Sequence, residues 1–408
     1  MKSKRKLEER VVMRRLTTDD TAQYNALLRY AFQVTDSELK ALGWNRKEME
    51  RSKKPVLKKT ESFGFFDGEK LASQISIYPM QMNVFGTMYR MGGVTGVATY
   101  PEYAGHGLMS RLVKVALQNM QENHQCISML YPYAIPFYRR KGWEIVTDKM
   151  TFTIRDSQLP RIRQVEGMVE RVDTESEDLH RVHDRFTQMR HGALKRNELE
   201  WEEYWRWEAD DVLVAVYYDA EEEPTGYLVY YISNDVFRIK EMVTITQEAR
   251  HGLWNYISAH FSMIDKVVGY NYTNEPMAFL LEDSEIQEEI RPCMMARIVD
   301  FEGFIRSYPF DIISIHDDLH FEIMDPVMEC NTGHFSLTWD EKGRTILKRD
   351  SREGELVRCS IQTLATMFLG YRRPAYLRRV EKLEAGDEAV RILEDIIPNE
   401  QPYFSDYF

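Results

Sequence analysis

The spacing of apolar residues along the first third of the chain alternates between that of helices and that of strands. Residues 21–32 place apolar side chains on one helical face, and 63–100 is typical of several short strands joined by glycine-containing turns. A second amphipathic helix is predicted at 108–124, directly after a glycine turn. The following segments predict, in order, a strand at 126–134, a turn with a short helix at 135–143 and a closing strand at 144–156. This order indicates an α/β or α+β layer that ends near Asp156.

The same pattern starts again after a polar stretch at 157–178, which we interpret as a linker. It predicts helices, then strands, then a further helix, in an order that echoes the first third of the chain. The repetition suggests an internal duplication. The second copy carries Arg250-His251-Gly252 where the first has two glycines around a histidine, so we expect this copy to be degenerate.

The last part of the chain, from about Met294, shows a different pattern that is typical of an α+β domain. It finishes in the aromatic segment 403–408, although terminal segments are usually polar and frayed, and we therefore expect this tail to be buried. The sequence thus predicts an α+β protein in which two similar units, each a mixed sheet with flanking helices, precede a third α+β domain. The predicted boundaries are 1–156, 157–293 and 294–408.

Composition narrows the class of protein further. The chain has 408 residues, of which 43% are hydrophobic and 12% aromatic, so each domain can bury a core. A formal net charge of -12 argues against a nucleic-acid partner and fits cationic small molecules better. No apolar run approaches the roughly 20 residues of a membrane span, and the basic N-terminal arm lacks a signal peptide, so a soluble protein without membrane contact is expected. The four cysteines are scattered without metal-ligand spacing, which indicates a reducing cytoplasm and no metal site.

The turn Gly105-His106-Gly107 is the first candidate for chemistry. It lies between a predicted strand and a predicted helix, where successive backbone N–H groups and the positive end of a helix dipole suit a pyrophosphate. Glycine lets the phosphate oxygens approach the backbone and tolerates positive φ. A purely structural turn would use the same residues, so the turn alone leaves both interpretations open.

A second motif follows about thirty residues later, in the segment FYRRKGW at 137–143. In this order the two motifs resemble the acetyl-CoA motif and the tyrosine motif of the GNAT N-acetyltransferase superfamily. The resemblance implies acetyl-CoA as cosubstrate. Its pantetheine arm would lie along the strand before the glycine turn, flanked by the neighbouring strand, and its pyrophosphate would lie at the turn and the first residues of the helix. The binding residues so implied are Val97, Ala98, Thr99, Gly105, His106, Gly107, Leu108, Met109, Ser110, Tyr133 and Ala134. Ala104 departs from the family pattern, which has Arg or Gln there, so we expect weaker phosphate contacts.

Tyr138, in the second motif, is the candidate general acid. A phenol with a pKa of about 10 stays protonated at neutral pH and can donate its proton to the departing thiolate. The alternative is a packing tyrosine whose hydroxyl is solvated. His106 is a weaker candidate base, because it lies inside the phosphate turn and we expect its ring to point outward.

The whole chain resembles the enhanced intracellular survival (Eis) family of N-acetyltransferases. The segments that carry this resemblance are 190–201, 296–310, 364–377 and the terminal FSDYF. It implies a third domain with a sterol carrier protein fold, a hexameric assembly, and an acceptor amine on an aminoglycoside, another polyamine or a lysine. No sterol function follows from the fold alone.

The same resemblance implies that the α-carboxylate of Phe408 is the general base. An α-carboxyl group has a pKa of about 3.3–3.7 in water, so it needs desolvation or a relaying water to accept a proton from an amine. The alternative is a tail that only attaches the third domain to the first. Asp406 is the candidate anionic contact for the substrate.

Other interpretations stay open. The third domain's cavity could hold an apolar ligand in a non-catalytic binding protein, with the first two domains as scaffold. Transfer of a longer acyl group, as in N-myristoyltransferases, is a further alternative. The aromatic run Trp201, Tyr204, Trp205 and Trp207 is compatible with a cation–π cage, although its spacing favours helix packing.

Overall fold

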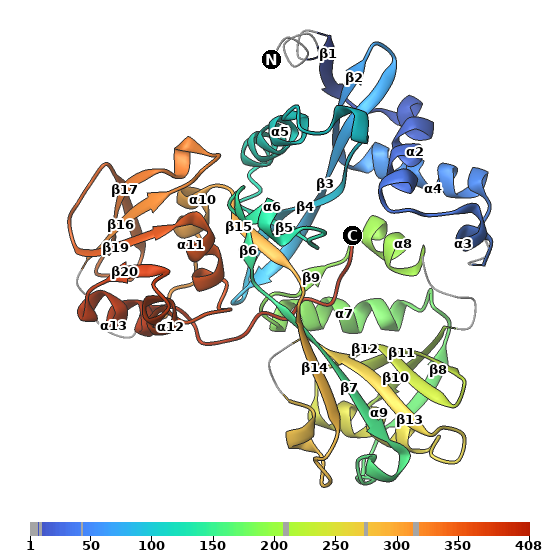
Figure 1. The fold of residues 1–408 in the computed structure, drawn as a ribbon. Helices are drawn as coiled ribbons and strands as arrows, with labels where there is room; N and C mark the ends of the chain where they lie inside the picture. Colours follow the sequence, from blue (N-terminus) through green and yellow to red (C-terminus); the bar gives the residue numbers. More distant parts are fainter. Residues whose placement is uncertain (1–6, 8–9, 42–43, 207–211, 273–275, 313–317) are drawn as a thin grey trace.

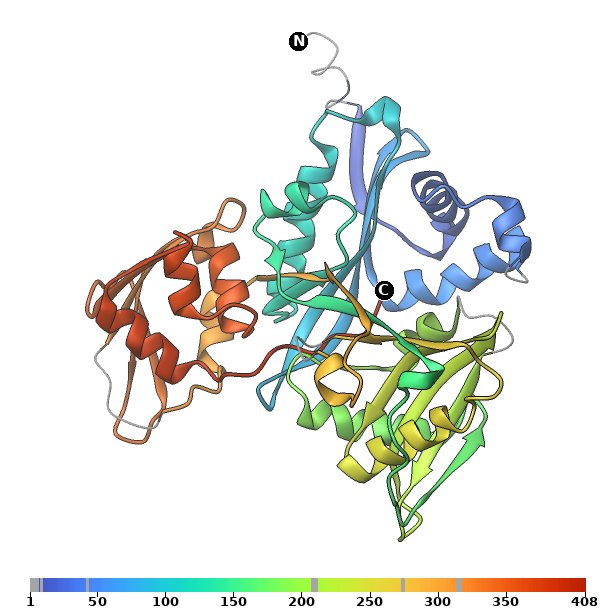
Figure 2. The ribbon, with the colours of Figure 1, turned by 60° about the horizontal axis from the view of Figure 1, so that its bottom comes forward.

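The computed structural model describes residue 7 and residues 10–41, 44–206, 212–272, 276–312 and 318–408, and within them the chain forms three lobes (Figure 1). Each lobe is built on its own sheet, which confirms the predicted α+β class. The C-terminus lies between the first two lobes, although it is far from both of them in the sequence (Figure 2). Trp207 lies outside the described residues.

The first lobe is a mixed sheet with helices on both faces. Its central hairpin consists of β3 (Lys70–Val84) and β4 (Thr87–Thr99), which are long strands where the sequence predicted several short ones. The remaining strands, in sheet order, are β1 (Val11–Arg15), β2 (Glu61–Asp67), then β3, β4, β5 (Ile127–Leu130), β15 (Met295–Ile298) and β6 (Glu144–Ile145), with β9 (Leu194–Lys195) paired to β3. Its helices are α2 (Thr21–Ala31), α3 (Asp36–Ala41), α4 (Arg46–Lys59), α5 (Leu108–Glu122) and α6 (Ile135–Arg139), with short 3-10 turns at Thr18–Asp20 and Pro101–Tyr103.

Helices α2, α5 and α6 lie where the hydrophobic pattern placed them, whereas α3 and α4 were not predicted. The sequence of α4 is rich in Lys, Arg and Glu and contains Pro55, so its apolar face is short. The side chains of Val56 and Leu57 are nevertheless buried, with 0% and 4% of their surface exposed. Tertiary packing stabilises this helix where its own sequence gives only a weak signal.

The second lobe repeats the arrangement of the first. Its strands, in sheet order, are β14 (Gln287–Pro292), β7 (Asp148–Arg155), β13 (Lys266–Asn271), β12 (Val236–Thr244), β11 (Pro224–Ser233), β10 (Leu213–Tyr218) and β8 (Met168–Val172). Its helices are α7 (Glu177–Met189), α8 (Glu198–Arg206) and α9 (Gln247–Ser258), with 3-10 turns at Asp156–Gln158 and Ala278–Leu280. The stretch interpreted as a linker therefore contributes an edge strand, β8.

Two strands are exchanged between these lobes. β7 follows the first domain along the chain but pairs with β13 and β14 in the second sheet. β15 follows the second domain but lies between β5 and β6 in the first sheet. The single closing strand predicted at 144–156 is therefore wrong: only β6 stays in the first sheet, and β7 completes the second.

The third lobe packs helices on one side of a sheet with strand order β18 (Thr345–Arg349), β17 (Gly333–Trp339), β16 (Leu319–Met324), β19 (Glu355–Ser360) and β20 (Leu383–Ala385). Its helices are α10 (Phe301–Arg306), α11 (Ile361–Phe368), α12 (Pro374–Arg379) and α13 (Asp387–Ile396), with a 3-10 turn at Glu329–Asn331. Aromatic side chains pack in its interior. The ring centroids of Phe301 and Phe335 lie 5.0 Å apart in an edge-to-face arrangement, and the ring of Phe368 contacts that of Phe321.

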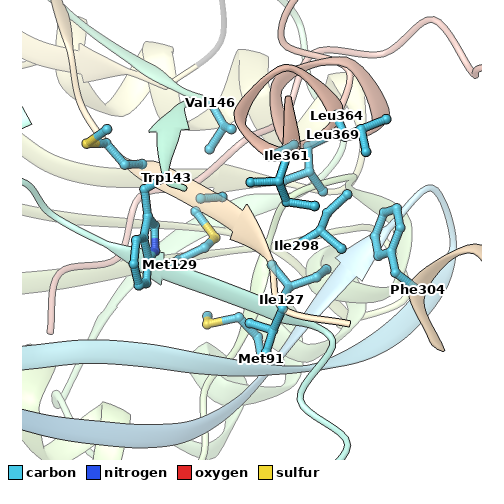
Figure 3. Close-up of a cluster of buried hydrophobic side chains, with 14 of the residues drawn as sticks. Met91, Ile127, Met129, Trp143, Val146, Ile298, Phe304, Ile361, Leu364 and Leu369 are labelled. Atoms are coloured by element: carbon cyan, nitrogen blue, oxygen red, sulfur yellow. The ribbon is translucent and has the colours of Figure 1, made fainter. Parts of the chain in front are cut away.

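The third lobe is anchored on β15. Figure 3 shows Ile361, Leu364 and Leu369 around α11 packed against Ile298 on β15 and its neighbours in the first sheet. A buried ion pair reinforces the contact, because Arg297 Nη2 lies 2.5 Å from Asp325 Oδ2 and both side chains are 0% exposed. The exchanged strand thus supports both the first sheet and the third lobe.

Candidate active site

A cavity opens in the first sheet where β4 and β5 diverge. These parallel strands are paired only from Met91 to Gly93, and beyond that point β4 bonds to β3 alone. A bulge around Gly96, whose φ is +61°, bends β4 at the same place. The resulting cavity has a volume of about 380 Å³ and is lined by β4, by the segment after β5, by α2 and by the chain's last two residues.

Several of the predicted binding residues line this cavity. They are Val97, Ala98, Thr99, Met109, Tyr133 and Ala134. Leu108 instead buries its side chain in the core, so only its backbone is available. The other predicted binding residues are not part of the cavity lining. The turn before α5 contains Gly105, His106 and Gly107, and Ser110 lies in the first turn of the helix. The sequence analysis missed Phe32, directly after α2, and the β4 residues Val94 to Gly96, although a glycine within a strand signals close approach of another group.

The turn before α5 has the geometry of an anion cradle. Gly105 and Gly107 have φ of +75° and +77°, and open space surrounds the position where a Cβ would stand. Among the described residues, no acceptor meets the N–H groups of Gly105, His106 and Gly107. His106 is half-buried and its Nδ1 is enclosed without a partner in the described part of the chain, so its ring is only partly in contact with solvent. These free donors at the start of a 15-residue helix suit a phosphate group.

Tyr138, on the short helix α6, reaches the cavity from the side of β5. It is 6% exposed, and burial raises its pKa to about 12. Its ring packs edge to face against Phe137 and Trp143, and Trp143 in turn lies in the cluster of Figure 3. The neutral phenol is therefore held in place and stays protonated across the physiological range.

The C-terminal tail reaches the first lobe, with Phe404 1% exposed and Pro402 and Asp406 also buried. Phe408 lies against Gly93 of β4, where any Cβ would come within 2.8 Å of its ring. It lines the cavity described above and also a second one of about 330 Å³. No cation of the described residues lies within ion-pair distance of its carboxylate.

The second cavity shares Phe408 with the first. Tyr24, Tyr78 and Phe32 form aromatic walls, and Lys53 and Glu203 are 3.6 Å apart at its edge. Burial lowers the pKa of Lys53 to about 7. Phe408 therefore borders both a space beside β4 and Tyr138 and a space beside α2 and α4.

A buried ionic cluster from the second lobe holds the tail. Arg196 Nη2 lies 2.7 Å from Glu241 Oε1, and its Nε lies 2.5 Å from Asp406 Oδ1. The guanidinium is 0% exposed and stacks 4.1 Å from the Tyr204 ring. Ser405 Oγ donates to Glu241 at 2.8 Å, so two consecutive tail residues are fixed.

This cluster corrects the role expected for Asp406. Its carboxylate forms an ion pair with Arg196 and it lines neither of these cavities, so the structure does not support an anionic substrate contact at Asp406. Burial raises the pKa of Asp406, whereas Arg196 holds the pKa of Glu241 low despite its burial. The aromatic run of α8 does meet cations, but these are the protein's own Arg196 and Lys240.

Two classes of feature are missing from the described residues. No helix among them is both long and apolar enough to cross a bilayer. Nor do they bring three His, Cys, Asp or Glu side chains close enough together to share a metal ion.

Comparison with known proteins identifies the domains. Residues 12–146 and residues 192–298 each match the acetyltransferase (GNAT) domain family, and residues 301–405 match the sterol carrier protein domain family. No curated protein matches the sequence.

Solved structures share the arrangement over nearly the whole chain. A conserved protein of unknown function from Enterococcus faecalis V583, described as a probable N-acyltransferase, is 27% identical with a TM-score of 0.89, over 98% of this chain and 99% of that one. A GCN5-related N-acetyltransferase from Anabaena variabilis is 23% identical with a TM-score of 0.85, over 98% and 100%. Eis1 from Mycobacterium abscessus is 18% identical with a TM-score of 0.79, also over 98% and 100%. The last two establish a common fold.

Proposed function

Because this chain is an Eis-like GNAT acyltransferase, with two GNAT domains followed by a sterol carrier protein domain, we propose that it transfers the acetyl group of acetyl-CoA to an amine. The observation that carries this proposal is the meeting of three features in the first lobe: the divergence of β4 and β5, the cradle at Gly105 to Gly107, and Tyr138 and Phe408 on one cavity. The second lobe lacks the glycine turn and serves the first as a support.

Acetyl-CoA fits the residues present. The free N–H groups of the turn and of the first residues of α5 hold the pyrophosphate, and the unpaired edge of β4 accepts the pantetheine amides as a further strand would. The aromatic and aliphatic lining places the thioester beside Tyr138. Ala104 contributes no side chain to the phosphates, so the backbone alone carries this contact.

The acceptor enters the second cavity and meets the thioester at Phe408. The neutral amine nitrogen attacks the thioester carbon, and the Phe408 carboxylate accepts one proton from that nitrogen. The carbon–sulfur bond then breaks, and the Tyr138 hydroxyl donates a proton to the sulfur. The carboxylate takes up one proton and the phenol releases one, so the protons balance. Because the amine attacks the thioester directly, no covalent intermediate on the enzyme is required.

The lining of the acceptor cavity narrows the class of amine. Among its described residues, Arg29 and Lys53 are basic, Glu203 is paired with Lys53, and the other acid is the terminal carboxylate of Phe408, so these walls lack the several acids that a polycation needs. Its walls are instead formed by Tyr24, Tyr78 and the ring of Phe408. We therefore favour an amine with an apolar or aromatic body, or a lysine side chain, over a polycation. We also propose a hexamer, which a measurement of mass in solution tests.

Tyr138→Phe is the test of this function. The ring keeps its packing against Phe137 and Trp143 while the donor is lost, so kcat is expected to fall about 100-fold with little change in KM for acetyl-CoA. Tyr89→Phe is the matched control, because its buried hydroxyl donates to Phe304 O away from the cavity. Steady-state kinetics with acetyl-CoA and a panel of amines measures both variants. Unchanged turnover in Tyr138→Phe would contradict the assignment.

Gly107→Ala tests the cradle. Alanine at a φ of +77° costs roughly 1–2 kcal/mol, and relaxation of the turn misplaces the donors. We expect KM for acetyl-CoA to rise about tenfold, the effect of about 1.4 kcal/mol. Gly343→Ala, at a φ of +72° in an open turn of the third lobe, should lower stability similarly and leave KM unchanged. Equal KM values for acetyl-CoA in the two variants would show that the turn does not contribute to cofactor binding.

A further inference from the structure

The second lobe retains the architecture of a ligand site. β12 and β13 run parallel and are paired only from Val236 to Arg238, after which they diverge as β4 and β5 do. A bulge in β12 near Lys240 repeats the bulge in β4. The space between the strands is a cavity of about 430 Å³, which lies in the range of roughly 300–1,000 Å³ typical of small-molecule sites.

This cavity does not suit a second molecule of coenzyme A. The turn before α9 has no glycine, and the Thr246 hydroxyl accepts from Ala249 N at 3.1 Å, which occupies a donor of the first helical turn. Glu248 places a carboxylate in that turn, where it accepts from Tyr217 and from Gly167 N. A phosphate would meet both an occupied donor and a negative charge.

The lining indicates a different ligand chemistry. Phe152, Phe186, Tyr270 and Tyr272 provide aromatic walls. Trp254 lines the same cavity and is 5% exposed, and its Nε1–H is enclosed without an acceptor in the described part of the chain. A buried N–H without an acceptor is unfavourable, so an acceptor that reaches it from the cavity would be stabilised.

Positive charge lies beside this donor. Arg250 is half-buried and lines both this cavity and an adjoining one of about 240 Å³, which Trp254 also lines. No carboxylate of the described residues forms an ion pair with Arg250, and Arg163 lies on the adjoining cavity. The acid on the wall, Glu241, is neutralised by Arg196.

From this arrangement we propose that the second lobe binds an organic carboxylate with an aromatic or apolar body. The Arg250 guanidinium and the Trp254 indole N–H hold the carboxylate, and the aromatic walls hold the body. The site is separate from the acetyl-transfer cavity, and the proposal does not depend on the acetyl acceptor.

Calorimetric titration of the full chain with 4-phenylbutyrate tests the proposal, with 4-phenylbutanamide as the uncharged counterpart. We expect the carboxylate to bind and the amide to bind at least tenfold more weakly. Arg250→Gln should weaken carboxylate binding at least tenfold, because the cation is lost from a partly desolvated site. Arg171→Gln, an exposed change on β8 of the same lobe, should leave it unchanged.

A second readout locates the ligand. In protein labelled with ¹⁵N-tryptophan, the indole N–H signal of Trp254, identified by its loss in Trp254→Phe, should move on addition of 4-phenylbutyrate and not in Arg250→Gln. Equal binding of acid and amide, equal binding to the wild type and Arg250→Gln, or an unmoved Trp254 signal would each overturn the proposal.

Discussion

Extension of the chain by two glycines after Phe408 is expected to lower kcat by about 10²–10⁴-fold, the usual contribution of a general base, with binding of coenzyme A retained. The extension replaces the carboxylate at Phe408 by a peptide amide, which cannot accept the proton. It also carries the new carboxylate up to about 7 Å away. The aromatic ring against Gly93 is untouched, so the tail keeps its place.

A fusion with a self-cleaving intein directly after Phe408 provides the control, because hydrolysis at that junction restores the native carboxylate without refolding. Recovery of kcat after this treatment is expected, and calorimetry with coenzyme A checks that binding is constant throughout. An extended chain that turns over at the wild-type rate would show that the tail only attaches the lobes.

Arg196→Met is expected to destabilise the protein by about 3–5 kcal/mol and to remove most of the activity. The substitution leaves Glu241 and Asp406 buried without a counter-ion, which is the costly way to break such a cluster. It also releases the tail, because Asp406 lies two residues before Phe408. Denaturant unfolding measures the loss, and kinetics at low temperature, where the variant is still folded, measures kcat.

Two further variants separate stability from positioning. Arg306→Met breaks an exposed pair with Glu302 and should change stability by less than about 1 kcal/mol. Asp406→Asn keeps the shape of the tail but weakens its attachment, so kcat should fall with only a modest loss of stability. If Asp406→Asn retained full kcat, the cluster would have no part in placing the base.

The parts of the structure that depend on local spacing could be predicted from the sequence. The helix at 108–122 and the turn before it follow from an apolar stripe and two glycines, and Tyr138 follows from its motif. The strand exchange could not be predicted in this way, because β7 and β15 have ordinary strand patterns and their partners are set by tertiary pairing.

The ionic cluster was missed for a related reason. Arg196 is a single basic residue before α8, and nothing in its neighbourhood distinguishes it from a solvated arginine. Asp406 was found but given the wrong partner, since a lone acid in an aromatic tail fits a substrate contact as well as a buried ion pair. Only the fold brings residues 196, 241 and 406 together.

The exchange of β7 and β15 also bears on how the protein is made. A ribosome produces chains from the N-terminus, and the first sheet lacks β15 between β5 and β6 until residue 298 has emerged. The second lobe must therefore be synthesised before the first lobe can complete its sheet. Each lobe therefore needs a strand that the other's stretch of the chain carries, and an exchange of one lobe by recombination would have to include that strand.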